Sequence, residues 1–308
     1  MAVDLFSIGP FTIHGYGLMI AIGMISALFI ADARAQKKGL NGDYVWQLSI
    51  LIMFIGWAGG KLMYCIVEWE RLLSDPASVL SSSGFVVYGG IITGVLTAVV
   101  YCRIRKLDFR DYADLIVPEV SLAQAFGRIG CFLAGCCYGR ETDCWCGVVF
   151  SHSPYAPQGV KVIPTQLISA GGNFIFFLVL LYFSAKTKVK GHVIALYLML
   201  YSIGRFAVEF LRGDPRGNVG ILSTSQFIAI FIFAAGLALW VLFSRIGKGE
   251  QGKVAGEIRG ETSEAAIKET SEAATEETTE DIIEETTEEI REETAEAATE
   301  EMAEEKRG

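Results

Sequence analysis

Arg128 is the residue of this sequence whose position most requires a chemical explanation. It lies in an otherwise apolar and small-residue stretch, QAFGRIGCFLAGCCYGR. A second arginine lies in YSIGRFAVEFLR, where Tyr201, Arg205 and Glu209 follow at intervals of four residues and so share one face of a helix. A guanidinium is always charged, and its planar fork matches two phosphate oxygens. Two such groups in apolar segments favour the binding of an anionic lipid headgroup.

Four further polar residues lie in or beside apolar segments. His14 and Tyr16 precede and open the first such segment, and Tyr88 lies near the start of the third. Lys61 follows GWAGG, a small-residue stretch that permits close helix packing. We expect Lys61 either to extend its ammonium toward the interface or to pair with Glu209.

Seven cysteines are present, and five of them lie in CFLAGCCYGRETDCWC: Cys131, Cys136, Cys137, Cys144 and Cys146. Their spacing does not match the paired C-x2-C patterns of common zinc sites. An extracytoplasmic location favours disulfides. We therefore expect a structural role, as disulfides or free thiols. A metal site that includes His152 and a redox or acyl-carrier role stay open as alternatives.

Seven segments are long and apolar enough to cross a membrane, which takes roughly 20 residues. They span about 15–34, 44–67, 84–104, 112–135, 165–185, 192–212 and 224–246. The first has no basic region before it and no small-residue cleavage site after it, so we expect a membrane helix and not a cleavable signal peptide. The predicted fold is an all-α integral membrane protein with seven transmembrane helices.

The orientation follows from lysine and arginine in the short loops. Alternate loops near residues 34–38, 103–110, 186–190 and 245–253 hold 13 of these residues, whereas the opposite loops hold 5. This asymmetry predicts an outside N-terminus and an inside C-terminus.

The acidic composition belongs to the C-terminal part of the chain. The net charge is −9 overall, but residues 250–308 contain 21 acidic and 6 basic residues, net −15, which leaves +6 for the rest. We expect a membrane domain over 1–246 and a disordered, acidic, cytoplasmic tail over 247–308. A weak coiled-coil or partner-binding role for the tail is the alternative.

The orientation places most intramembrane charge near the outer surface. Lys61, Arg128, Arg205 and Glu209 fall in outer halves of their helices, and Glu119 is the exception we identify in an inner half. A through-membrane ion path would distribute ionisable groups over the full thickness. A transporter would place charges or broken helices near the midplane. We therefore expect a cavity that opens near the outer leaflet. The structural alternative is that Arg205 and Glu209 only neutralise each other.

Four segments together resemble the bacterial prolipoprotein diacylglyceryl transferase family. They are SIGPFTIHGYGLMIAIG, GRIGCFLAGCCYGR, PTQL and YSIGRFAVEFLR, in the family's order, and the likeness covers most of residues 7–246. The second resembles a family signature close to G-R-x-G-N-F-x-N-G-E-x-[WY]-G-R. Positions that match family residues are Tyr16, Arg128, Gly139, Tyr201, Arg205 and Glu209.

The resemblance implies a reaction at the outer leaflet of the bacterial cytoplasmic membrane. The diacylglyceryl group of phosphatidylglycerol would move to the thiol of the lipobox cysteine of a secreted preprotein, forming a thioether and releasing glycerol phosphate. The implied partners are phosphatidylglycerol, such preproteins and the bilayer, with no nucleic acid, no metal and no organic cofactor.

The chain departs from the family pattern at several positions. Tyr88 replaces the histidine expected before GG in the third helix, and Ile163 replaces the one before PTQL. Cys131 and Cys136 replace the signature's asparagine and glutamate. Tyr88 is a poor general base, since its ordinary pKa is about 10. Either that histidine is dispensable, or His14 takes its role, or the chain is a divergent lipid transferase with another acceptor. A non-catalytic lipid-binding or transport protein is the remaining alternative.

We assign the candidate roles on this basis. Arg128 and Arg205 would hold the phosphate and stabilise the leaving phosphate monoester. Tyr16 and Tyr201 would hydrogen-bond the headgroup, and His14 would accept the thiol proton. The catalytic candidates are His14, Tyr16, Tyr201, Arg205 and Glu209. The substrate-binding candidates are Lys61, Tyr88, Arg128 and Gly139.

Overall fold

The computed structural model describes residues 4–8, 11–82, 84–151, 153, 155–213 and 217–249. Seven helices in these ranges are long and apolar enough to cross a membrane, which confirms the predicted fold class. They are α1 (Gly15–Lys37), α2 (Gly42–Val67), α5 (Val87–Ile104), α6 (Phe109–Ala134), α7 (Thr165–Lys186), α8 (His192–Glu209) and the helix Thr224–Gly249. The acidic tail of 247–308 lies outside the described residues from residue 250 onward.

Short elements occur between the long helices. Two short helices, α3 (Trp69–Ser74) and α4 (Pro76–Ser81), join α2 to α5. Three antiparallel strand pairs are formed by β1 (Asp4–Ile8) with β2 (Phe11–His14), β3 (Val148–Val149) with β4 (Lys161–Val162), and β5 (Asn218–Val219) with β6 (Leu222–Ser223). None of these pairs was expected from the sequence.

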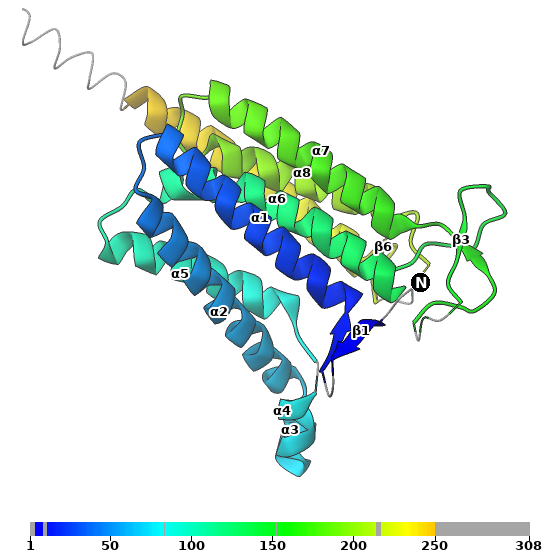
Figure 1. Cartoon of the computed structure of the whole chain (residues 1–308). Helices are drawn as coiled ribbons and strands as arrows, with labels where there is room; N and C mark the ends of the chain where they lie inside the picture. Colours follow the sequence, from blue (N-terminus) through cyan, green and yellow to red (C-terminus); the bar gives the residue numbers. More distant parts are fainter. Residues whose placement is uncertain are drawn as a thin grey trace, which may run out of the picture. The chain divides into compact units, whose positions relative to one another are not determined.

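Successive crossings alternate in direction, so the connections fall at two ends. We call the end with the connections 38–41, 105–108 and 187–191 the basal end, and the end with 68–86, 135–164 and 210–223 the distal end (Figure 1). Helix α6 packs between α1 and α7, and α7 packs on α8. Helices α2 and α5 pack chiefly on each other.

Glycines bring α2 and α5 into close contact, as the small-residue stretch GWAGG predicted. A Cβ atom at Gly89 would lie 2.5 Å from the carbonyl oxygen of Gly59, and one at Gly90 would lie 2.9 Å from that of Gly56. Only glycine permits this backbone approach. At the basal end, a shared core joins this pair to α1 and α6 through Ala31, Ala35, Val45, Leu48, Tyr101, Cys102, Tyr112 and Leu115.

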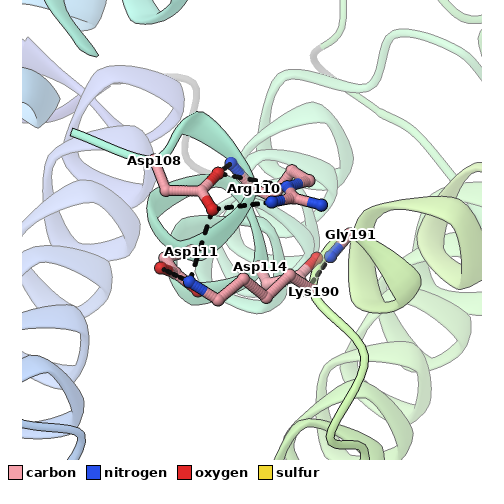
Figure 2. Close-up of polar contacts among 6 residues, drawn as sticks. All are labelled: Asp108, Arg110, Asp111, Asp114, Lys190 and Gly191. Atoms are coloured by element: carbon pink, nitrogen blue, oxygen red, sulfur yellow. Dashed lines mark hydrogen bonds and ion pairs between the residues drawn. The ribbon is translucent and has the colours of Figure 1, made fainter. Parts of the chain in front are cut away.

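Charged residues at the basal end fix the starts of α6 and α8. Asp108 caps α6 by accepting a hydrogen bond from the backbone N–H of Arg110 at 3.0 Å. Helix α8 begins after Gly191, which has no side chain to cap it. Asp114 of α6 supplies the cap, because its carboxylate accepts from the backbone N–H of Gly191 at 2.6 Å (Figure 2). It also accepts from the backbone N–H of Ile194 at 3.0 Å. Lys190 bonds both Asp108 and Asp111.

One expectation about buried charge needs correction. Glu119 is not the single exception, because Asp114 is also buried toward the basal end of α6. Arg34 of α1 pairs with Glu119, and it also donates to the carbonyl oxygen of Leu115 at 2.7 Å and the hydroxyl of Ser184 at 2.8 Å. These groups join α1, α6 and α7, so a structural role accounts for them.

Candidate functional site

The chain turns sharply where α6 ends at its distal end, and this turn brings three thiols together. Gly135 ends the helix with a φ of 72°. Its N–H bonds the carbonyl of Phe132 at 3.2 Å, and the N–H of Cys136 bonds that of Cys131 at 3.1 Å. This double bonding is the Schellman termination, which brings the side chains of its first and last residues together. Cys137 also has a positive φ, 63°, which is uncommon for a residue with a side chain.

The first turn of α7 holds this turn in place. Thr165 donates its hydroxyl to the carbonyl of Cys137 at 2.8 Å, and Gln166 donates its amide to the carbonyl of Cys136, also at 2.8 Å. Both side chains are buried. The PTQL motif therefore positions the end of α6.

Gly139 lies where the two arms of the connection 135–164 meet the connection 210–223. Its N–H donates to the carbonyl of Ile163 at 2.9 Å, and it forms a β-bridge with Arg212. A Cβ atom here would lie 2.7 Å from the carbonyl oxygens of both Ile163 and Leu211. Close backbone packing explains the glycine without reference to a substrate.

The long connection after α6 has a small buried core of its own. Phe150, Ala156 and Val162 form a small buried core with Phe132, Tyr138 and Val148. The hydroxyl of Ser153 donates to the carbonyl of Ala134 at 3.0 Å and accepts from the N–H groups of Tyr155 and Ala156. The connection thus supports the distal end of α6. His152 lies outside the described residues.

Arg128 is half-buried and lies six residues before the end of α6 at Ala134. Within the described part of the chain it forms no hydrogen bond and no ion pair. Tyr16 of α1 lies close by: a Cβ atom at Gly130 would be 3.1 Å from the Tyr16 ring, and the hydroxyl is near enough to Arg128 and the three thiols to interact electrostatically. A half-buried cation without a protein acceptor is available to an anionic ligand.

One hydrogen bond between α6 and α8 shows which residues of the two helices lie at the same level along the bundle axis. Gln124 donates its amide to the hydroxyl of Tyr197 at 2.8 Å. Arg128 lies one turn beyond Gln124, and Tyr201 lies one turn beyond Tyr197 with ring centroids 5.9 Å apart. Because the two helices run in the same direction, Arg128 and Tyr201 occupy the same level of the bundle.

Arg205 lies one further turn along α8 and is already paired. Its Nη1 is 2.9 Å from Oε2 of Glu209, with side chains 15% and 6% exposed, and its Nη2 donates to Ser225 at 2.7 Å. The contact with Glu209 is close but poorly directed, since that carboxylate oxygen accepts no well-aligned hydrogen bond from the described residues. Arg205 and Glu209 therefore pair with each other, as both the catalytic role and the alternative of mutual neutralisation allow.

The remaining candidates lie apart from this group or have structural partners. Lys61 donates to the carbonyls of Val79 at 3.0 Å and Ser82 at 2.7 Å, so the expected pairing with Glu209 is wrong. Tyr88 is exposed on α5, which packs mainly on α2. His14 is exposed at the start of α1 and does have an interaction partner.

All seven cysteines are free thiols. The sulfur atoms of Cys131, Cys136 and Cys137 lie within 4.8 Å of one another. Hydrogen bonds from Cys131, from Cys136 and from the buried Arg212 lower the pKa of the Cys137 thiol. Cys144 and Cys146 form a separate exposed pair, 2.8 Å between sulfurs. The sequence reading missed Arg212, Ser225 and the supporting amides, because their partners are distant in sequence.

The fold and this site define a multi-pass membrane protein with partly buried arginines and a thiol cluster at the distal end. The family model described as "Prolipoprotein diacylglyceryl transferase" matches residues 4–242. The chain therefore belongs to this family, as the resemblance predicted.

Several curated relatives carry the name phosphatidylglycerol--prolipoprotein diacylglyceryl transferase. One from Clostridium tetani is 45% identical over 234 residues, covering 76% of this chain and 94% of that protein. One from Clostridium perfringens, named with the suffix 2, is 44% identical over 82% of this chain and 100% of its own length. One from Streptococcus uberis is 33% identical over 79% of this chain and 95% of its own.

Proposed function

We propose that this chain transfers the diacylglyceryl group of phosphatidylglycerol to the thiol of a lipobox cysteine in a secreted preprotein. The acceptor thiolate attacks the glyceryl carbon that carries the phosphate ester. A C–S bond forms, the C–O bond to phosphate breaks, and glycerol phosphate leaves with the bond electrons. The names of the relatives support phosphatidylglycerol and a prolipoprotein as substrates, and the lipobox cysteine follows from the family resemblance.

The observation that carries this proposal is the half-buried Arg128, which has no hydrogen-bond acceptor among the residues that the structure describes. Its guanidinium binds two phosphate oxygens and offsets the negative charge that grows on the leaving group. Tyr201, at the same level, donates its hydroxyl to the headgroup, and Tyr16 does so from α1. Arg205 acts as a second cation whose direction is fixed by Glu209 and Ser225.

The acceptor proton needs a base, because a free thiol has a pKa near 8.5. His14 takes it in this proposal, since it lies two residues before Tyr16 at the distal end. Tyr88 and Lys61 line the donor's route from the bilayer and do no chemistry. Gly139 contributes by holding the connections together.

The loop charges support an outside N-terminus and an inside C-terminus, with the distal end at the outer surface of the bacterial cytoplasmic membrane. Residues 1–246 form the catalytic domain in this proposal, and 247–308 a cytoplasmic tail. A secreted acceptor meets the site on this side.

The test is transfer of labelled diacylglycerol from phosphatidylglycerol vesicles to a lipobox peptide by the purified full chain. The wild type should transfer, and Arg128→Ala should lose at least tenfold in kcat/KM. Complementation of cells depleted of their own transferase gives the cellular readout. Well-expressed wild type that modifies no lipobox peptide would overturn the proposal and favour another acceptor or a non-catalytic role.

A further inference from the structure

Three thiol groups converge beside the proposed lipid site, where the family signature has an asparagine and a glutamate at two of the three positions. The sulfurs of Cys131, Cys136 and Cys137 lie within 4.8 Å of one another. Three thiolates around one zinc ion at a Zn–S distance of about 2.3 Å lie roughly 3.8 Å apart. The cluster therefore fits around one ion with only small side-chain rotations.

We propose that Cys131, Cys136 and Cys137 bind one Zn²⁺ ion and leave its fourth position open to the acceptor thiol. Three protein ligands with one open position is the arrangement of catalytic zinc sites, whereas structural sites are closed by four ligands. The role of the open position rests on the proposed function, but the metal site itself does not.

The backbone around the cluster is fixed before any ion binds. The α6 termination sets Cys136 against Cys131, and Cys137 is held at a φ of 63°. Thr165 and Gln166 hold the two carbonyls of the vicinal pair at 2.8 Å each. Because the ligands are preordered, little chain entropy is lost on binding.

The charge balance also fits. Zn²⁺ displaces one proton from each thiol and forms a complex of net charge −1 with three thiolates. Arg212 is buried beside Cys137 and offsets that charge. Tyr16 and Arg128 lie beside the cluster, so an acceptor bound to zinc would be next to the proposed phosphate site.

The proposed role follows from the reaction's need for a thiolate. A thiol bound to zinc is deprotonated outright, so the metal lowers the acceptor's pKa and its proton passes to His14 or to water. The zinc-bound sulfur then attacks the glyceryl carbon as described above. This would compensate for Tyr88, which replaces the third-helix histidine.

Metal content tests the site directly. The full chain, purified in detergent without chelator, should carry about one zinc per chain by elemental analysis. Cys131→Ser, Cys136→Ser and Cys137→Ser should each lower this at least tenfold, and the control Cys144→Ser/Cys146→Ser should not. Cobalt replacement should give thiolate-to-metal charge-transfer absorption that the three single variants lose.

A thiol-protection experiment on the wild-type protein tests the site even if the cysteine variants fail to fold. Three thiols should react with an alkylating agent only after a chelator is added, and zinc should restore their protection. Absence of stoichiometric zinc, or a disulfide within the cluster of the unreduced protein, would overturn the metal site.

The catalytic part has a separate readout. Removing the metal with a chelator should lower the rate of diacylglyceryl transfer at least tenfold, and added zinc should restore that rate. A chain that transfers equally well without metal would overturn the thiol-activating role alone. A chain that binds zinc but never transfers would overturn the proposed function and leave the metal site standing.

Discussion

The amide of Gln166 donates a 2.8 Å hydrogen bond to the carbonyl oxygen of Cys136 and so joins the first turn of α7 to the end of α6. Both groups lie in segments that are 30 residues apart in sequence. The Gln166 side chain is buried, at 1% exposed, and the bond is partly buried. Helix α7 thus supports the thiol cluster without contributing a thiol.

Replacing Gln166 by Leu should destabilise the protein and impair transfer. The carbonyl of Cys136 would lose this buried donor, at a cost of about 1–3 kcal/mol. We expect a lower melting temperature in detergent and at least a tenfold loss of kcat/KM. The neighbouring control Leu167→Ala alters a side chain that is 40% exposed and should retain activity. Equal effects of the two changes would contradict a specific role for the amide.

Arg128→Lys should separate charge from geometry at the proposed phosphate site. Lysine keeps the positive charge but loses the planar fork that binds two oxygens. One charge-assisted hydrogen bond is worth about 1.5–3 kcal/mol, so kcat/KM should fall roughly ten- to a hundredfold. We expect activity in the order arginine, lysine, alanine, with unchanged melting temperatures. If lysine and alanine gave equal activities, bidentate binding would not be what Arg128 supplies.

Glu209→Gln should destabilise the distal end of α8. The change retains size but leaves the Arg205 charge without its carboxylate, and both side chains are largely buried. Breaking such a pair from one side costs about 3 kcal/mol or more, whereas replacing both members is far less costly. Thermal unfolding should therefore rank Arg205→Met/Glu209→Met above Glu209→Gln in stability. The double variant should nevertheless be inactive, because it lacks the second cation. An active double variant would show that the pair is structural only.

Sequence patterns predicted local features well and long-range ones poorly. Helix spans follow from apolar length, and the glycines of α2 and α5 indicate close packing wherever they occur. The common face of Arg205 and Glu209 follows from a spacing of four. Each of these features depends only on residues within one segment or on composition, so the sequence pattern is enough to predict it.

Contacts between distant segments were missed for a physical reason. Asp114 caps α8 from a position 77 residues before Gly191, and no local pattern encodes that partner. Cys131 and Cys136 meet because Gly135 adopts a left-handed backbone, a feature that the cysteine spacing alone does not reveal. Lys61 lies among backbone carbonyls of a turn whose position depends on α4.

Gly139→Ala should destabilise the junction between the connections 135–164 and 210–223. Its new methyl group would lie 2.7 Å from two backbone carbonyl oxygens, and neither can move without shifting a connection. Overpacking of this kind costs about 1–3 kcal/mol. The control Gly171→Ala adds a methyl group in α7 with nothing within 4 Å and should be neutral or slightly stabilising. Melting temperatures of the two variants decide this, and equal values would contradict the steric explanation.

Lys190→Met should reveal a pH-dependent contribution from the basal network in Figure 2. The hydrogen bond to Asp111 raises the pKa of Lys190 above its ordinary value of 10.5, since this contact and those with Asp108 outweigh burial. A raised pKa means that the stabilisation is complete at neutral pH and is lost as the pH rises through the folded-state pKa. The contribution is at most about 1 kcal/mol, because the side chain is 44% exposed.

The measurement is the difference in free energy of unfolding between wild type and Lys190→Met across pH. It should stay constant from near neutrality to about pH 10 and shrink above the ordinary lysine pKa. A low-pH limit follows from Asp108: burial acts to raise its pKa, but hydrogen bonds from Arg110 outweigh burial and lower it from 3.8. The stabilisation that ionised Asp108 contributes to the folded state is therefore present above pH 3.8 and is lost as the pH falls through the lowered pKa. Lys188→Met, an exposed change in the same connection, should show no such dependence. A difference that grew with rising pH would contradict the sign of the Lys190 contribution.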